Sequence, residues 1–200
     1  MVATVSSMLH HRMGYLVLVG ITLGAYLDFT HTHGSEITYP PGTNHWRGIL
    51  TFAFVYSVPS WLYACWCVAS GCPTEPVSYR LSVPFTFVFA LCYLHTSYGD
   101  EVYGMTADDK TMLLGAASAF FWLFFDRSWQ GFVGAAVTAA AGCYAEHSLC
   151  ESALMNYTSP QLGRVPYWLF ALYFLGTVTW GHCARRILTD PDPVLRIGRM

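Results

Sequence analysis

The sequence predicts an all-α membrane protein, a six-transmembrane-helix bundle with short loops. Of its 200 residues, 54% are apolar and only 11% are charged, whereas charged residues make up about a quarter of an ordinary soluble domain. Apolar stretches of the length that a helix needs to cross a bilayer recur along the whole chain. We therefore expect most of the protein surface to face lipid.

The apolar stretches cover approximately residues 13–30, 48–69, 81–98, 111–125, 129–148 and 166–184. Short clusters of proline, glycine or charged residues separate them, so residues 1–200 are expected to form a single transmembrane domain, with residues 185–200 as a short flexible tail. The first stretch is expected to stay in the protein, because no cleavage site of small residues follows it. Pro59 predicts a kink in the second span. The small residues that begin with Gly131 and Gly134 favour close helix contact in the fifth span.

The distribution of charge predicts the orientation in the membrane. If the spans alternate in direction, one side carries most of the basic residues, namely Arg12, Arg80, Arg127, Arg185, Arg186, Arg196 and Arg199. The opposite side carries only Arg47, Lys110 and Arg164, and it also carries the acidic residues Asp100, Glu101, Asp108, Asp109, Glu146 and Glu151. Basic residues are retained on the cytoplasmic side during insertion, so both termini are expected to be cytosolic.

Several functional classes are disfavoured. The net charge of −2 and the absence of a dense basic stripe argue against a nucleic-acid partner. The spacing of His31, His33 and His45 matches no zinc pattern. No sequence signature of an activated nucleophile or of a phosphate-binding loop is present, and the spans contain almost no polar groups midway. An interior that is apolar, aromatic and rich in small residues suits a lipid or sterol better than catalysis. A disulfide between Cys143 and Cys150 is left open.

The few polar residues near helix ends are the candidate functional residues. Asp126 and Arg127 either end the fourth span at the level of the lipid headgroups or offer a carboxylate to a partner at the membrane surface. Ser128 is in position to cap the fifth span. His95, near Ser97 at the end of the third span, is either an interfacial residue or a ligand-contacting one. Asn156-Tyr157-Thr158 forms an acceptor sequence for N-glycosylation on the side opposite the termini.

Several short motifs resemble the Insig family of sterol-sensing regulators. The strongest similarity begins at Phe125-Asp126-Arg127-Ser128, which follows an aromatic run containing Trp122. It continues through Tyr157-Thr158-Ser159-Pro160 and through Gly176, Val178, Thr179, Gly181 and Arg185. Upstream the similarity is looser but collinear, at Ile37-Thr38-Tyr39-Pro40-Pro41, Val58-Pro59 with Cys65, Glu75-Pro76, and His95 with Ser97, where Leu94 replaces an asparagine.

The resemblance implies a six-span protein of the endoplasmic reticulum membrane with cytosolic termini, in agreement with the orientation that the arginines predict. Insig proteins bind oxysterols, hold Scap in the reticulum and bring HMG-CoA reductase to ubiquitin ligases. By this resemblance, the partner-binding residues are Asp126, Arg127, Ser128 and Trp122. The sterol- or lipid-binding residues are Trp122, Phe125, His95 and Ser97, with the third and fourth spans forming the sterol-facing wall. A bound oxysterol or other lipid is then the only expected ligand.

Two functional hypotheses follow. The leading one is a non-catalytic, lipid-dependent adaptor, in which sterol and a sterol-sensing partner such as Scap or HMG-CoA reductase each raise the affinity for the other. The alternative is a lipid-binding or carrier protein that acts without Scap, as in bacterial relatives, where a diacylglycerol-like lipid is the ligand and the plasma membrane is the location. Gly20 with Gly24, or the helix that begins near Gly131, would then supply a face for a homo-oligomer.

Overall fold

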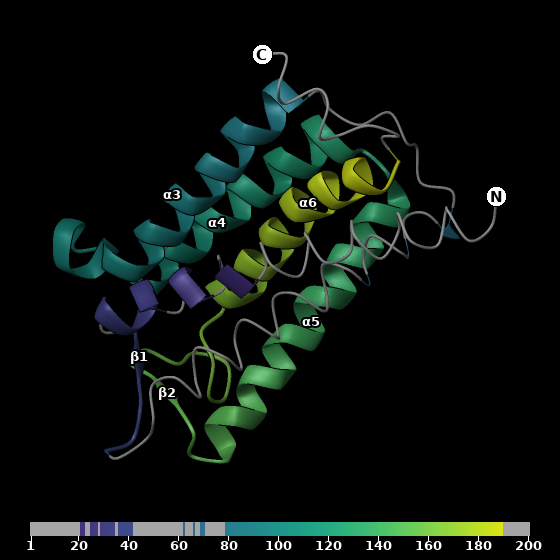
Figure 1. The fold of residues 1–200 in the computed structure, drawn as a ribbon. Helices are drawn as coiled ribbons and strands as arrows, with labels where there is room; N and C mark the ends of the chain where they lie inside the picture. Colours follow the sequence, from purple (N-terminus) through teal and green to yellow (C-terminus); the bar gives the residue numbers. More distant parts are fainter. Residues whose placement is uncertain are drawn as a thin grey trace.

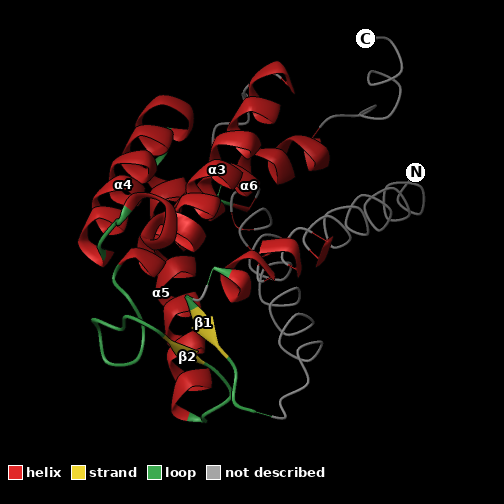
Figure 2. Cartoon of the chain, turned by 90° about the vertical axis from the view of Figure 1, so that its left-hand side faces the viewer, coloured by secondary structure: helices red, strands yellow, loops and turns green. Residues whose placement is uncertain are grey.

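The computed structural model describes residues 21–22, 25–27, 29–34, 36–41, 62, 66, 69–70 and 79–189. Long helices dominate this part of the chain: α3 (Tyr79–Tyr103), α4 (Ala107–Phe121), α5 (Trp129–Glu151) and α6 (Trp168–Thr189) (Figure 1). A π-helical turn, η1 (Trp122–Asp126), continues α4. Two short strands, β1 (Ile37–Thr38) and β2 (Asn156–Tyr157), pair antiparallel with Ile37 opposite Tyr157 (Figure 2).

Four of the predicted spans coincide with helices. The stretch 81–98 lies within α3, 111–125 falls on α4 and η1, 129–148 lies within α5, and 166–184 overlaps α6. The predicted spans 13–30 and 48–69 lie mostly outside the described residues, as do Pro59, the Gly20 and Gly24 pair, and the tail after residue 189. The fold is therefore mostly helical, as predicted. Among the described helices, none combines the length and the hydropathy that are typical of a membrane-crossing segment.

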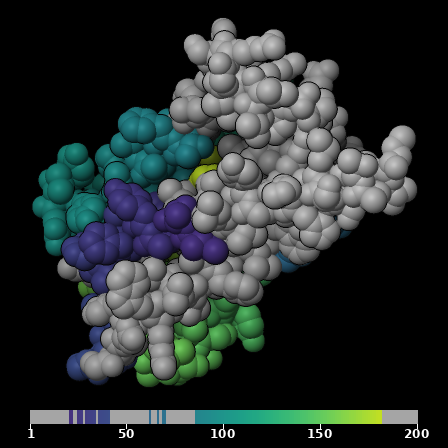
Figure 3. Space-filling model, in the orientation of Figure 1, coloured from purple at the N-terminus to yellow at the C-terminus, as the bar shows by residue number. Residues whose placement is uncertain are grey.

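Helix α6 lies at the centre of the bundle, between α5 on one side and α3 with α4 on the other (Figure 1). Its buried face contributes Trp168, Leu172, Leu175 and Val178, each at most 2% exposed. The described residues of 21–41 pack beside α3, as Figure 3 shows. Beneath the surface, the hydroxyl oxygens of Thr30 and Ser97 lie 3.4 Å apart. The core is thus organised around one central helix rather than around a sheet.

Small residues on α5 allow it to pack closely against α6. Gly131, Ala135, Ala139 and Gly142 recur at intervals of three or four residues and are all buried, so they form one face of the helix. At Gly142 an added Cβ would lie 2.9 Å from the ring of Tyr173, closer than such contacts allow. The predicted close contact along the fifth span is confirmed.

A buried ion pair joins the loop before β1 to the start of α4. Lys110 and Glu36 are 1% and 3% exposed and form a salt bridge, and the Lys110 Nζ also lies 2.8 Å from Oδ1 of Asp100. Burial raises the pKa of Glu36, although the charge of Lys110 acts in the opposite direction. Because the backbone N–H of Thr158 donates to the Glu36 carbonyl at 3.0 Å, the cluster ties the loop before β1 to α3, to α4 and to the loop after β2 at one end of the bundle.

His31 is a core residue at the same end. One ring nitrogen, Nε2, lies 3.1 Å from the hydroxyl of Thr96, and the other, Nδ1, lies 3.0 Å from the hydroxyl of Tyr93. Burial, with a smaller contribution from the charge of Lys110, lowers the pKa of His31 to about 3. The imidazole is therefore neutral at physiological pH and serves packing.

The interior is less apolar than the sequence predicted. Glu146, which the sequence analysis groups with the acidic residues at the membrane side opposite the termini, lies on α5, is 1% exposed, and accepts hydrogen bonds from the hydroxyls of Tyr157 and Tyr173. No local pattern indicates this contact, because the two tyrosines lie 11 and 27 residues further along the chain. Cys143 and Cys150 are both free, so the disulfide left open above does not form.

We predict that Lys110→Met lowers the free energy of unfolding by about 3 kcal/mol at neutral pH, because it leaves the buried Glu36 without its cation. Without Lys110, the pKa of Glu36 in the folded protein rises further above its unfolded value, so a proton stabilises the variant below that pKa and the deficit shrinks as pH is lowered. Thermal unfolding of the purified protein at several pH values measures this effect.

Glu151→Gln is the matched control, because Glu151 forms only an exposed pair with His147 at 3.8 Å and such pairs are worth about 0–1 kcal/mol. Equal unfolding temperatures for Lys110→Met and the unmodified protein would show that the cluster does not stabilise the fold.

Candidate lipid-binding site

A tight turn connects α4 to α5 at the end of the bundle opposite the ion pair. The helix widens into the π-helical turn η1, and Arg127 ends it in the left-handed conformation with φ 51°. The Arg127 N–H donates to the carbonyl of Trp122 at 2.8 Å, and its Nε donates to the carbonyl of Leu123 at 2.6 Å. Such π-helical turns occur frequently at functional sites.

Asp126 is held inside this turn. The Ser128 hydroxyl donates to its carboxylate, and the same hydroxyl accepts the backbone N–H of Gly131 at 3.0 Å. Ser128 is therefore the N-cap of α5, as predicted. A Cβ at Gly131 would overlap the carboxylate of Asp126, so the missing side chain at this position makes room for the carboxylate.

Trp122 connects the turn to a groove between α4, α5 and α6. Its indole N–H donates to the Ser128 carbonyl at 3.1 Å, and its ring packs edge-on against Phe132 with centroids 5.0 Å apart. The groove, here called the Trp122 groove, has a volume of about 360 Å³ and is lined by Gly115, Ser118, Ala119, Trp122, Leu123, Phe132, Phe170, Ala171 and Phe174. Apart from Ser118 and the Trp122 nitrogen, these side chains are apolar, and both polar groups donate to backbone carbonyls.

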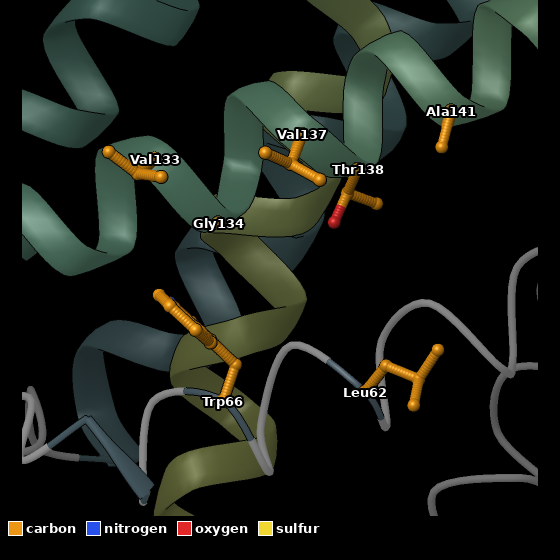
Figure 4. A pocket seen from close by; sticks show the side chains of 7 residues that line it. All are labelled: Leu62, Trp66, Val133, Gly134, Val137, Thr138 and Ala141. Carbon is orange, nitrogen blue, oxygen red and sulfur yellow. The ribbon is translucent and has the colours of Figure 1, made fainter.

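A second cavity lies on the other side of α5, facing residues of the predicted second span. This α5 cavity has a volume of about 410 Å³ and is lined by Leu62, Trp66, Val133, Gly134, Val137, Thr138 and Ala141 (Figure 4). The Trp66 indole N–H donates to the backbone carbonyl of Gln130 at 3.3 Å, which ties its wall of the cavity to the first turn of α5. Both cavities have the size that ligand pockets show, roughly 300–1,000 Å³.

Of the predicted lipid-contacting residues, Trp122 lines one of the two cavities described above. His95 stacks on Tyr103, and Ser97 is buried beside Thr30 near the far end of α3, so the length of α4 separates both from Trp122. Phe125 packs against the ring of Phe121, with centroids 5.5 Å apart. The described residues thus place Asp126, Ser128 and Trp122 together, whereas His95 and Ser97 lie elsewhere.

Sequence reasoning missed the α5 cavity. Its α5 residues 133, 134, 137, 138 and 141 do recur at helical spacing, and they are offset from the small residues that face α6. The small residues form one face of α5, and the cavity residues form another face. This pattern could have indicated a helix that is packed on one side and open on the other. The contribution of Leu62 and Trp66 depends on contacts over about 70 residues of chain and left no local signal.

The fold and its cavities define a class of protein: a bundle of antiparallel helices with apolar clefts beside its central helices. No family model matches the chain. Over 77 residues, 38% of its length, the chain is 34% identical to the insulin-induced gene 1 protein of Danio rerio. The matched segment spans 31% of that relative.

Solved structures extend the comparison to the whole fold. The chain superimposes on a mycobacterial Insig homologue, MvINS from Mycobacterium vanbaalenii, with a TM-score of 0.77 and 18% identity, covering 91% of this chain and 97% of MvINS. The same values hold for a cross-linked MvINS trimer. The fold is therefore that of Insig proteins, bacterial homologues included, and the predicted resemblance to this family is confirmed.

We predict that Gly131→Ala lowers stability by about 1–3 kcal/mol, because the new methyl group must displace the Asp126 carboxylate from the turn. Gly115→Ala is the control, since an added Cβ there meets nothing within 4 Å and alanine favours a helix. Paired thermal unfolding curves distinguish the two variants, and an unchanged Gly131→Ala would mean that the turn has more room than its geometry indicates.

Proposed function

We propose that this chain is a non-catalytic membrane protein that binds a lipid and acts as a regulator of the Insig kind. The membrane location is supported by the arrangement of side chains on α5. Its buried residues are mainly glycine and alanine, whereas Trp129 and Tyr144 on its outer surface are 70% and 75% exposed. Large side chains outside and small ones at the helix contact are typical of a bundle that lies in lipid.

The observation that carries lipid binding is the α5 cavity. Its described lining is almost wholly apolar, it has ligand size, and it is bounded by α5 and by Leu62 and Trp66, which are far from α5 in sequence. A lipid in this cavity would remove its own apolar surface and that of the lining from contact with water, at roughly 25 cal/mol per Å² of apolar area. The Trp122 groove is a second apolar site, and it adjoins the turn that holds Asp126.

The finer proposal is that lipid binding controls the capture of a sterol-sensing partner, such as Scap or HMG-CoA reductase, in the endoplasmic reticulum. Asp126, Arg127, Ser128 and Trp122 would form the partner-binding end. The Asp126 carboxylate already accepts a hydrogen bond from Ser128, so we propose that it shapes the turn as well as meeting the partner. Phe125, His95 and Ser97 remain proposed lipid contacts, and a bound oxysterol is the proposed ligand.

The alternative is a lipid-binding protein that acts without Scap in a bacterial membrane, with a diacylglycerol-like ligand. It is favoured by the fold, which matches a mycobacterial Insig homologue over 91% of this chain, whereas the sequence match to the Danio rerio protein covers 38%. The homologue has been crystallised as a cross-linked trimer, which supports a homo-oligomer. Gly131 is already occupied by contact with Asp126 of the same chain, so another face would carry the association.

We predict that Ala141→Phe weakens lipid binding on the order of tenfold, because the phenyl ring takes up part of the α5 cavity. Binding of a fluorescent sterol and of a fluorescent diacylglycerol to the purified protein in detergent measures the effect and shows which of the two ligands is preferred.

Ala140→Phe is the matched control, because Ala140 is an exposed neighbour on α5 that does not line the cavity. If both variants bound lipid as tightly as the unmodified protein, the α5 cavity would not be the lipid site.

For partner capture, we predict that Asp126→Ala reduces co-precipitation of a sterol-sensing membrane protein while lipid binding stays within about twofold. Asp126→Asn should retain more of the capture, because the amide oxygen can still accept from Ser128. Glu101→Ala, an exposed substitution at the opposite end of the bundle, controls for the loss of a carboxylate. Full capture by Asp126→Ala would remove this residue from the proposed interface.

A further inference from the structure

Asn156 begins an acceptor sequence for N-glycosylation that the proposed function does not use. The chain has two asparagines, Asn44 and Asn156, and only Asn156 is followed two positions later by a serine or threonine. The acceptor sequence begins in β2, in the connection between the end of α5 and the start of α6 (Figure 2). A glycan is large and hydrated, so it can be carried there only if the segment faces water.

The two residues that define the acceptor sequence lie on the outward side of this segment. Met155 and Tyr157 are 1% and 6% exposed, whereas Asn156 and Thr158 are exposed. This alternation is typical of an extended chain, in which residues two positions apart share a face. The Tyr157 hydroxyl donates to the buried carboxylate of Glu146, which holds the segment in this orientation. Asn156 and Thr158 are therefore presented together to solvent.

The fold does not use the side-chain amide of Asn156. Within the described part of the chain, the hydrogen bonds at this position involve its backbone, which pairs with Thr38 of β1 and whose carbonyl accepts the Thr38 hydroxyl at 3.4 Å. Thr38 lies opposite Asn156, and it is a small and exposed residue. The amide nitrogen can therefore carry a sugar without the loss of a hydrogen bond that holds the two strands together.

Charged side chains indicate that this end of the bundle lies outside the hydrocarbon of the membrane. The Thr158 N–H donates to the carbonyl of Glu36, which pairs with Lys110, and Gln161 donates to the exposed carboxylate of Asp108 at 3.0 Å. Charged groups are costly within a bilayer. The arginine distribution predicts that this end faces away from the cytosol. In the endoplasmic reticulum that side is the lumen, where N-glycans are attached.

We propose that Asn156 is a site of N-glycosylation. In this reaction the amide nitrogen of Asn156 forms a bond to the anomeric carbon of an oligosaccharide that is carried on a polyisoprenyl pyrophosphate. The bond between that carbon and the phosphate oxygen breaks, the pyrophosphate leaves with the electron pair, and the nitrogen releases one proton to a base of the transferase. The modification goes beyond lipid binding and depends on the proposed location in the endoplasmic reticulum.

The test is the electrophoretic mobility of the full-length protein from cultured animal cells, on denaturing gels, before and after treatment with peptide-N-glycosidase. We expect the enzyme to increase the mobility of the unmodified protein in a single step, because the chain holds one acceptor sequence. Asn156→Gln and Thr158→Val should migrate like the deglycosylated protein with or without the enzyme. Thr158→Ser keeps the acceptor hydroxyl, and Asn44→Gln lies outside the acceptor sequence, so both should retain the step.

An unchanged mobility of the unmodified protein would overturn the proposal, and an acceptor sequence added at the N-terminus shows the reason. If neither the added sequence nor Asn156 carries a glycan, the β2 segment is closed to the transferase, and the proposal fails by itself. A glycan on the added sequence but not on Asn156 would show a reversed orientation in the membrane, and the predicted orientation would fail as well. Neither result affects the proposed lipid binding, which the Ala141→Phe comparison measures independently.

Discussion

The close approach of α5 to α6 is the contact on which the rest of the bundle depends. Glycine and alanine at the buried positions of α5 allow the two backbones to approach closely, and the missing side chain at Gly142 leaves room for the ring of Tyr173. A larger residue there would move α5 away from the central helix. Because one face of α5 is used in this way, a neighbouring face is left to line the α5 cavity with Leu62 and Trp66. One face of α5 therefore packs against α6, and another face of the same helix lines the cavity.

Polar contacts fix the two ends of the bundle between which the cavities lie. At one end, the Lys110 and Glu36 pair and the contact of Glu146 with Tyr157 and Tyr173 hold the loops against the helices. At the other end, Ser128 holds Asp126 and caps α5. Loops expected on one side of a membrane do meet at one end, which agrees with helices that alternate in direction. The apolar middle of the bundle, between these two polar ends, is the region where a ligand can be accommodated.

Patterns within one helix were predictable from the sequence, whereas contacts between distant segments were not. The four helices, the Ser128 cap and the small-residue contact of α5 follow from runs of apolar residues, from one serine at a helix start and from the spacing of glycines and alanines. The Lys110 and Glu36 pair joins residues 74 positions apart, and nothing in either local sequence indicates it. The motif that contains Trp122 marked this residue as a candidate through the resemblance, whereas Trp66 and Thr138 could not be assigned to a cavity from the sequence.

The central claim, that the α5 cavity holds a lipid, is tested most directly by photo-crosslinking. A lipid analogue with a photoreactive group in its apolar part would be bound to the protein in vesicles, activated, and its attachment sites mapped by mass spectrometry. The account predicts attachment to Leu62, Trp66 or α5 residues 133–141, suppressed by excess unlabelled lipid. Attachment confined to the outward-facing side chains, and unaffected by that excess, would contradict it.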